Sequence, residues 1–321
     1  MPNIKDHDVL SLGELVVEFF HKTPDVSFNK PAEILGPYPS GAAAIFIDTL
    51  ARLGAGTGYI GTIGDDEFGD CIINRLGSDN VNTDHIYRLE DATTGVAFRM
   101  TYSDGGRKFI YHIGNAAPGR LGKQHIDESF VGKFRHLHIS GNVLAFSESA
   151  RTGVLKAVDI AYGLGIPISL DPNLRLEMMK PQEIKDLLGP VLKKTTFFFP
   201  SMGEITYVTG RKNEDEGAKA LLDQGIEVIA RKEGQNGSTV ITKDRIIHIG
   251  PFNVEELDST GCGDAYCGAF VYGVLQGWPL EVTGRFSNAV GAITANRLGP
   301  MEGILSLGEV QEFIKIREQE G

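Results

Sequence analysis

Short apolar runs alternate with amphipathic stretches along most of this 321-residue chain. A short apolar run bounded by turn residues is typical of a buried strand, whereas apolar residues at helical spacing indicate a helix packed on one face. The strand-like runs are residues 58–63, 137–140, 166–170, 196–199 and 227–230. The helical stretches include residues 42–53, 149–162, 181–192 and 216–222. This alternation predicts βαβ units that form a mainly parallel sheet in an α/β fold, with helices on both faces.

Two regions lack this alternation. Residues 15–20 and 94–113 are strand-like without an intervening helix, and the letters S-D-G-G at 103–106 predict a hairpin turn. We expect residues 14–36 and 94–117, with a strand within 27–35, to form a small β-sheet lid. Residues 1–13, 37–93 and 118–321 would then form the main domain. Extra edge strands of the main sheet explain the same pattern equally well.

The composition argues against several classes of partner. The net charge of −11 disfavours nucleic-acid binding, which needs clustered Lys and Arg. No apolar run approaches the ~20 residues of a membrane span, and residues 1–12 lack the apolar core of a signal peptide. Cys71, Cys262 and Cys267 are an odd number without metal-ligand spacing, which favours a reducing compartment. We therefore expect a cytoplasmic protein without a nucleic-acid or membrane partner.

The loop at residues 258–264 reads D-S-T-G-C-G-D and leads into an apolar helical pattern. A helix start leaves backbone N–H groups unpaired and carries partial positive charge. Gly261 and Gly263 would let this backbone approach an anion closely. Asp264 lies at the same helix start, where the dipole should keep its carboxylate ionised. An anion-binding loop beside a base is what phosphoryl transfer to a hydroxyl requires, although an ordinary glycine-containing helix start has the same pattern.

This loop resembles the D-T/S-T-G-A-G-D signature of the PfkB-type, ribokinase-like sugar kinases, and the similarity extends from Gly13 to about Pro300. The resemblance implies a ribokinase-like three-layer α/β sandwich with a β-sheet lid, through which two subunits often pair. It also implies ATP, Mg²⁺ and often a monovalent cation such as K⁺. We therefore expect a homodimer that binds a small-molecule sugar.

The resemblance also assigns roles within the loop. Asp264 would be the base that activates a sugar hydroxyl. The anion hole for the transferring phosphate would consist of the amides of Gly261, Cys262 and Gly263. The monovalent cation would lie near Asp258 and Thr260.

Cys262 departs from the family signature, which has alanine at this position. Both side chains are small, so the loop should retain its function. A thiol at a helix N-terminus can have a lowered pKa, which predicts that thiol reagents inactivate the enzyme and that ATP protects it. A buried, unreactive cysteine is the alternative.

On the nucleotide side, the resemblance implies contacts from two matched segments and from a later helix. These residues are Ser201, Glu204, Lys232, Gly234, Gly237, Asn288 and Ala292. Glu204 would organise Mg²⁺ through water, and Ser201 replaces the usual asparagine with a shorter side chain that lacks the amide donors. Without the resemblance, Glu204 would be an ordinary carboxylate in the first turn of a helix. Residues 232–237 would form a hairpin turn, and Asn288 and Ala292 would serve close helix packing.

On the sugar side, the implied residues are Glu18, Ser40, Gly41, Ile45, Arg107, Tyr111 and Arg175. Ile45 stands where family members usually have an asparagine that holds a sugar hydroxyl, and Ser40 stands at a usual glycine. Glu18 stands where the family has aspartate, so the carboxylate is retained on a longer side chain. Sugar recognition must therefore be rearranged in this chain.

The lid segment bears on the expected substrate. Kinases of 2-keto-3-deoxygluconate usually carry Tyr-x-Arg here, with the arginine on the substrate carboxylate, whereas this chain reads Tyr111-His112-Ile113. Loss of a bidentate cation argues against an acid sugar. We expect ATP-dependent transfer of the γ-phosphate to a primary hydroxyl of a neutral ketohexose, of fructose or tagatose type. The alternatives are a 2-keto-3-deoxygluconate kinase, a nucleoside kinase and a sugar-binding homologue without catalysis.

Overall fold

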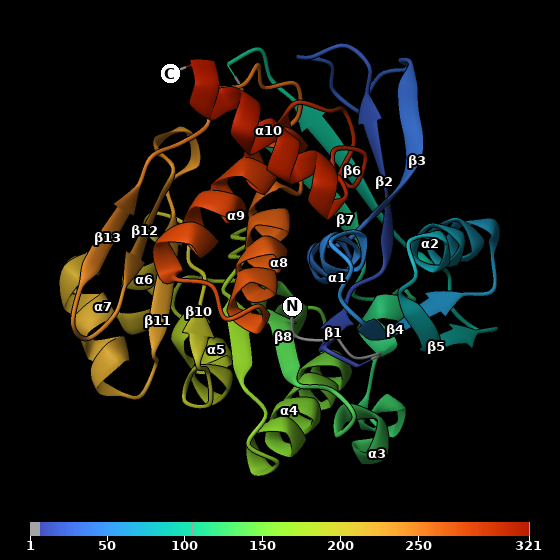
Figure 1. Ribbon diagram of the computed structural model, residues 1–321. Helices are drawn as coiled ribbons and strands as arrows, with labels where there is room; N and C mark the ends of the chain where they lie inside the picture. The colour runs from blue at the N-terminus through green and yellow to red at the C-terminus, as the bar shows by residue number, and fades with distance from the viewer. Residues whose placement is uncertain (1–6, 105, 321) are drawn as a thin grey trace.

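The computed structural model describes residues 7–104 and 106–320, which form a three-layer α/β sandwich and a second, smaller sheet (Figure 1). Within this part of the chain, the large sheet has nine strands. Their order is β13 (Ile246–Ile249), β12 (Ser238–Ile241), β11 (Val228–Lys232), β10 (Phe197–Phe198), β9 (Ile168–Asp171), β8 (His136–Ser140), β1 (Val9–Gly13), β4 (Thr57–Gly64) and β5 (Asn82–Leu89). Neighbours from β11 to β5 are parallel, whereas β11, β12 and β13 pair antiparallel. The predicted parallel sheet is thereby confirmed, with an antiparallel edge after β11.

Two helical layers cover the large sheet. One layer contains α1 (Ala42–Arg52), α2 (Glu67–Ser78), α8 (Cys262–Leu275), α9 (Leu280–Ala295) and α10 (Leu307–Glu320). The other contains α3 (Glu128–Val131), α4 (Glu148–Gly163), α5 (Ile184–Leu192), α6 (Glu204–Thr209) and α7 (Glu214–Asp223). Successive strand residues point to opposite faces, so Phe197 of β10 packs with the first layer and Phe198 with the second. In the described ranges, no helix is long and apolar enough to cross a membrane.

The small sheet has the strand order β3 (Ile34–Ser40), β2 (Val16–His21), β6 (Gly95–Thr101) and β7 (Arg107–His112). It is separate from the large sheet, so the interpretation as extra edge strands is wrong. β2 and β6 are parallel, and β6 and β7 form the expected antiparallel hairpin. The predicted turn at 103–106 includes residue 105, which lies outside the described residues.

The strand expected within residues 27–35 lies further along the chain. β3 begins at Ile34 and continues to Ser40, past residue 36, while residues 27–33 form turns and irregular backbone. β3 pairs antiparallel with β2, with Ser40 opposite Val16 and Ile34 opposite His21. The end of this strand is followed at once by α1, so the small sheet leads directly into the main body.

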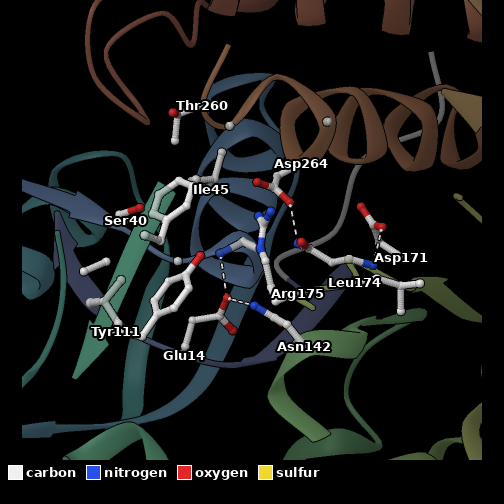
Figure 2. Close-up of a pocket in the computed structure, with 18 of the residues that line it drawn as sticks. Glu14, Ser40, Ile45, Tyr111, Asn142, Asp171, Leu174, Arg175, Thr260 and Asp264 are labelled. Carbon is white, nitrogen blue, oxygen red and sulfur yellow. Dashed lines mark hydrogen bonds between the residues drawn. The ribbon is translucent and has the colours of Figure 1, made fainter. Parts of the chain in front are cut away.

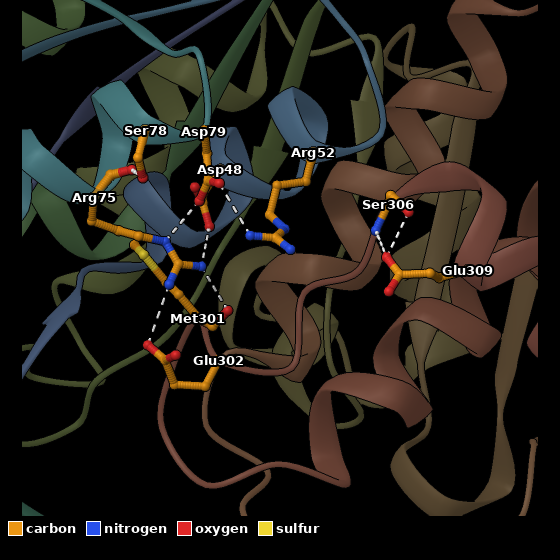
Figure 3. Close-up of polar contacts among 9 residues, drawn as sticks. All are labelled: Asp48, Arg52, Arg75, Ser78, Asp79, Met301, Glu302, Ser306 and Glu309. Carbon is orange, nitrogen blue, oxygen red and sulfur yellow. Dashed lines mark hydrogen bonds and ion pairs between the residues drawn. The ribbon is translucent and has the colours of Figure 1, made fainter.

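A buried ionic cluster joins α1, α2 and the chain after α9 (Figure 3). Arg75 of α2 lies at its centre with its side chain 17 % exposed, and the side chain of Asp48 of α1 is fully buried. The Arg75 guanidinium contacts Asp48 Oδ2 at 3.1 Å, Asp79 Oδ2 at 2.7 Å and Glu302 Oε1 at 3.3 Å. Burial raises the pKa of Asp48 to about 8, and the Arg75 guanidinium opposes this rise. Removing the guanidinium would leave the buried Asp48, and the Asp79 carboxylate beside it, without their shared partner.

Arg75→Met should lower the free energy of unfolding by about 3 kcal/mol, because breaking a buried pair leaves an uncompensated charge. Urea denaturation followed by circular dichroism measures this change. The matched control is Arg88→Met, because Arg88 is 37 % exposed in its pair with Asp70. An exposed pair contributes at most about 1 kcal/mol, so equal losses in the two variants would contradict the special role of the buried cluster.

Candidate active site

Polar side chains collect at the edge of the large sheet where the parallel strands end. Glu14 directly follows β1, Asn142 lies shortly after β8, Asp171 ends β9 and Lys232 ends β11. All four line one cavity of about 490 Å³. Ligands of open α/β sheets bind outside the carboxyl ends of the strands. This cavity is therefore the candidate active site.

The N-terminus of α8 forms one wall of the cavity. Gly261, the residue before the helix, has φ +82°, and a Cβ there would lie 2.4 Å from the carbonyl oxygen of Pro300. Glycine is required at this position on both grounds. The backbone N–H groups of Gly261, Gly263 and Asp264 have no acceptor among the described residues. Unpaired donors at a helix start can bind an anion, as the prediction for Gly261 and Gly263 requires.

Lys232 faces this helix start from the end of β11. A Cβ on Gly263 would lie 3.6 Å from the Lys232 Nζ, so the ammonium group and the unpaired amides border the same space. Nζ forms an ion pair with Asp171 Oδ2. Burial alone would lower the pKa of Lys232, but the surrounding acidic groups, Asp171 foremost, raise it above its ordinary value. The lysine therefore remains a cation that can contact a phosphate.

Asp264, the predicted base, lies in the first turn of α8 and lines the cavity. Its Oδ1 accepts a hydrogen bond from Asn173 Nδ2 at 3.3 Å. Burial, followed by the charge of Asp171, raises the pKa of Asp264 to about 7. The expectation that the helix dipole keeps this carboxylate ionised is wrong, because desolvation and a like charge have the larger effect. A base with a pKa near neutrality suits proton abstraction at neutral pH.

Glu204 begins α6 and lines the same cavity. Its carboxylate oxygens accept the backbone N–H groups of Leu174 at 2.8 Å and Ser201 at 2.7 Å. Ser201 therefore takes part through its backbone rather than through the shortened side chain. The residues that the structure describes contain no group of three or more side chains that could hold a metal. Mg²⁺ often keeps its waters and binds one or two carboxylates plus substrate phosphates, so Glu204 fits contact through water with a metal that arrives with the nucleotide.

A second cavity of about 670 Å³ adjoins the first, and Lys232 and Gly263 line both. Its wall includes the predicted nucleotide residues Gly234, Gly237, Asn288 and Ala292. The side-chain amide of Asn288 donates to the carbonyl oxygens of Ile249 and Gly250 at 3.1 and 3.0 Å. Asn288 thus anchors the end of β13, and its side-chain oxygen is the part that remains for a ligand.

The predicted sugar carboxylate, Glu18, is held by the protein itself. Its Oε1 accepts a hydrogen bond from Arg99 Nε at 2.6 Å, and its Oε2 accepts one from the Ser40 hydroxyl at 3.3 Å. Glu18 and Ser40 both line the cavity, as predicted. Their principal contacts, however, are with each other and with Arg99.

Glu14 has the free carboxylate oxygen that Glu18 lacks. Its Oε1 accepts hydrogen bonds from Asn142 Nδ2 at 2.8 Å and from the Ala42 N–H at 2.9 Å. Its Oε2 is buried and has no hydrogen-bond partner within the described ranges. Glu14 is 3 % exposed and lines the cavity. A buried oxygen of this kind needs a donor from a ligand or a water.

Ile45 and Gly41 shape the cavity through packing. Ile45 is 2 % exposed, and its side-chain carbons would lie 3.3 and 3.4 Å from a Cβ on Gly261, so it supports the helix start. Gly41 has φ +117°, and a Cβ there would lie 2.4 Å from the backbone oxygen of Glu14. Glycine at 41 therefore lets the start of α1 approach the residue with the free oxygen.

Tyr111 and Arg175 add donors to the same space, and Figure 2 shows both side chains near those of Glu14 and Asp264. Burial raises the pKa of Tyr111 to about 12, so its phenol keeps its proton. The Arg175 guanidinium forms no hydrogen bond or ion pair with another described residue, and its carbon lies 5.8 Å from the centre of the Phe109 ring. It is therefore available to an anionic group.

Asp258 and Thr260 have partners other than the expected monovalent cation. The buried Asp258 carboxylate forms a bidentate ion pair with Arg99, at 3.0 Å from Nη1 and 2.7 Å from Nη2. Thr260 Oγ1 accepts a hydrogen bond from Arg107 Nη1 at 3.0 Å. A guanidinium thus stands where the cation was expected, and these residues do not fit a bound K⁺.

Cys262 differs from the reactive thiol that the sequence predicted. Burial, followed by the charge of Asp258, raises the pKa of its thiol to about 12. The predicted lowering is wrong, because desolvation and negative charge outweigh the helix dipole. Its backbone N–H donates to Ser259 O at 3.4 Å, so the predicted anion hole would depend more on the N–H groups of Gly261 and Gly263.

Sequence reasoning missed five residues of this site, namely Glu14, Asn142, Asp171, Asn173 and Arg99. The first four share one signal, because each lies at or shortly after the carboxyl end of a parallel strand. Arg99 has no such signal. Its partners, Glu18 and Asp258, come from segments 81 and 159 residues away.

Residues 6–306 match the model of the pfkB family carbohydrate kinases. The chain is 29 % identical to fructokinase-2 from Zea mays over 317 residues, which cover 95 % of this chain and 93 % of that protein. It is 30 % identical to 5-dehydro-2-deoxygluconokinase from Clostridium perfringens over 326 residues, with 98 % and 94 % covered.

Solved structures agree with this match. A protein described as ribokinase II from E. coli, solved with ATP and Mg²⁺, has a TM-score of 0.92 and 38 % identity over 97 % of this chain and 99 % of its own. Fructokinase from Xylella fastidiosa with bound ATP has a TM-score of 0.87, 23 % identity, and 98 % and 99 % coverage, which shows the fold alone. With its ribokinase-like α/β fold and this family match, the chain belongs to the pfkB family of carbohydrate kinases.

Proposed function

We propose that this sugar kinase transfers the γ-phosphate of ATP to a primary hydroxyl of a neutral ketohexose, of fructose or tagatose type. The observation that carries this proposal is the unpaired, buried Oε2 of Glu14 in the substrate cavity. A sugar hydroxyl can donate a hydrogen bond to this oxygen, or accept one from it where burial, which raises the pKa of Glu14, keeps the carboxyl group protonated.

The charges of the cavity support a neutral substrate. Its carboxylates are Glu14, Glu18, Asp171, Glu177, Glu204 and Asp264, and its cations are Arg107, Arg175 and Lys232. Lys232 is paired with Asp171 and Glu18 with Arg99, which leaves four carboxyl groups, Glu14, Glu177, Glu204 and Asp264, beside the two cations Arg107 and Arg175. Ile113, the third residue of the Tyr-x-Arg pattern of acid-sugar kinases, lines the cavity with an apolar side chain.

The residues of the site divide the chemistry between them. Asp264 accepts the proton of the attacking hydroxyl, and the unpaired amides of Gly261 and Gly263 stabilise negative charge on the transferring group. Lys232 adds a fixed cation beside those amides. ATP supplies the phosphoryl group, and its Mg²⁺ supplies charge neutralisation near Glu204. Glu14 and Tyr111 would orient the sugar so that one hydroxyl faces Asp264.

One observation favours an acid-sugar kinase as the second candidate. The Arg175 guanidinium lacks an ion-pair partner within the described part of the chain. A substrate carboxylate would satisfy it, and one relative of this chain is named 5-dehydro-2-deoxygluconokinase. If the substrate is a neutral sugar, Arg175 would instead contact the transferring phosphate. The pairing of two subunits through the small sheet stays a prediction in either case.

Release of ADP with a panel of sugars tests the substrate class. We expect kcat/KM to be at least about tenfold higher for fructose or tagatose than for 2-keto-3-deoxygluconate, 5-keto-2-deoxygluconate or adenosine, because a lost charge pair or hydrogen bond costs at least ~1.4 kcal/mol. Glu14→Gln should raise KM for the sugar while KM for ATP stays unchanged. Higher kcat/KM for an acid sugar, lost in Arg175→Met, would establish the second candidate instead.

Asp264→Asn should lower kcat by about 10²- to 10⁴-fold, because the base that accepts the hydroxyl proton is removed. Affinity for ATP, measured by calorimetry, should change little, since the helix N–H groups remain. Asp244→Asn, at an exposed position, is the control and should match the wild type. An unaffected kcat in Asp264→Asn would remove Asp264 from its proposed role.

The pH profile tests the pKa of Asp264. The base must be unprotonated, so kcat/KM for the sugar should rise with pH through about 7 and level off above it. Asp171→Asn removes a like charge and frees the charge of Lys232, so the acid limb should move to lower pH. Glu177→Gln, at the exposed rim, should leave the limb in place. If Asp171→Asn leaves the acid limb of the pH profile unchanged, a group other than Asp264 is responsible for that limb.

A further inference from the structure

Arg99 is a buried arginine at the junction of the two sheets. It lies on β6 of the small sheet and is 2 % exposed. Its Nε donates to Glu18 Oε1 at 2.6 Å, and its two terminal nitrogens donate to the oxygens of Asp258 at 3.0 and 2.7 Å. The ring of Phe20 lies 4.3 Å from the guanidinium carbon. One side chain thus joins a substrate-cavity carboxylate to the loop that leads into the anion hole.

The Asp258 carboxylate is fully occupied by these and two further bonds. Oδ1 accepts from Arg99 Nη1 at 3.0 Å and from the Thr260 N–H at 3.0 Å. Oδ2 accepts from Arg99 Nη2 at 2.7 Å and from the Gly299 N–H at 3.1 Å. Each carboxylate oxygen has about two acceptor positions, so none is left for a metal cation.

These bonds position the anion hole. Thr260 directly precedes Gly261, and the Gly261 backbone packs against the carbonyl oxygen of Pro300, which directly follows Gly299. Asp258 therefore holds both segments that set the path of the backbone at the start of α8. Arg99 in turn holds Asp258 from the small sheet.

We propose that Arg99 is a positioning residue that supplies, in place of a bound monovalent cation, the positive charge that Asp258 requires, and that couples the small sheet to the anion hole. The enzyme should therefore turn over without a monovalent-cation requirement. This inference rests on the proposed function only in that it needs a phosphorylated sugar as readout.

The wild-type enzyme gives the first test, which needs no substitution. Turnover is measured in KCl, NaCl and tetramethylammonium chloride at equal ionic strength, with a sugar that the panel identifies. We expect kcat to agree within about twofold in the three salts, and the melting temperature not to rise specifically with K⁺, because a ligand that does not bind the folded state cannot stabilise it. Activation or stabilisation specific to K⁺ would overturn the inference.

Variants of Arg99 give the second test. Arg99→Ala should lower kcat by about 10- to 100-fold, because a small displacement of catalytic groups has effects of this size. Guanidinium at concentrations far below those that unfold the protein, or K⁺, should restore part of the lost kcat. Arg99→Lys should retain more activity than Arg99→Ala, yet less than the wild type, because a point charge cannot bridge both carboxylates. Arg88→Met, a surface arginine, is the control.

The outcomes separate this inference from the proposed function. If the wild-type enzyme phosphorylates no sugar, the proposed function is wrong. The effect of K⁺ on the melting temperature of the wild type then still tests the inference about Arg99. If the wild type is active and both Arg99→Ala and Arg99→Lys have a normal kcat, Arg99 is not a positioning residue. If Arg99→Ala fails to fold, Arg99→Lys provides the test. Full activity of the folded Arg99→Lys variant would also contradict the positioning role.

Discussion

The site depends on the contact between the N-terminus of α8 and the carboxyl edge of the parallel sheet. The first N–H groups of a helix cannot pair within it, and here those of Gly261, Gly263 and Asp264, which line one cavity with the strand ends, have no acceptors among the described residues. Residue 261 must be glycine here, because a Cβ would lie 2.4 Å from the carbonyl oxygen of Pro300. An anion-binding group and the acidic side chains of the sheet are thereby held at one place, which is the requirement for phosphoryl transfer.

Several buried acidic side chains surround Lys232, and together they determine the protonation states of the groups in the cavity. Asp171 pairs with Lys232 and, as a like charge, acts together with burial to raise the pKa of Asp264 to about 7. The same pair keeps Lys232 protonated. A single strand-end carboxylate, Asp171, thus acts on both Asp264, the proposed base, and Lys232, the proposed phosphate contact, because electrostatic interactions are strong where water is excluded.

The small sheet takes part in this arrangement and does more than cover the cavity. It contributes Tyr111 to the sugar side, and its Arg107 and Arg99 reach Thr260 and Asp258 in the loop before α8. A displacement of the small sheet would therefore shift the loop before α8, which contains the proposed anion hole. In the proposed function, these two arginines would link sugar binding beside the small sheet to stabilisation of the transferring phosphate.

The α/β class, the strands outside the βαβ alternation and the glycine-containing helix start at 258–264 were predictable from local patterns, whereas the separation of the small sheet from the large one was not. Apolar periodicity and glycine spacing follow from backbone geometry, which short segments express in any context. The roles of individual polar groups were not predictable in this way. Glu18 has the expected position in its strand, yet Arg99, 81 residues away, holds it, and Glu14 has the free oxygen instead.

The ionisation of Cys262 and Asp264 was decided by tertiary structure for the same reason. Both residues lie at a helix start, from which a lowered pKa was expected for Cys262 and an ionised carboxylate for Asp264, but burial and the charges of Asp258 and Asp171 raise the two pKa values. A local pattern specifies the helix and its dipole. It does not specify which distant charges and how much water surround a group, and in a buried site these two quantities have the larger effect on a pKa.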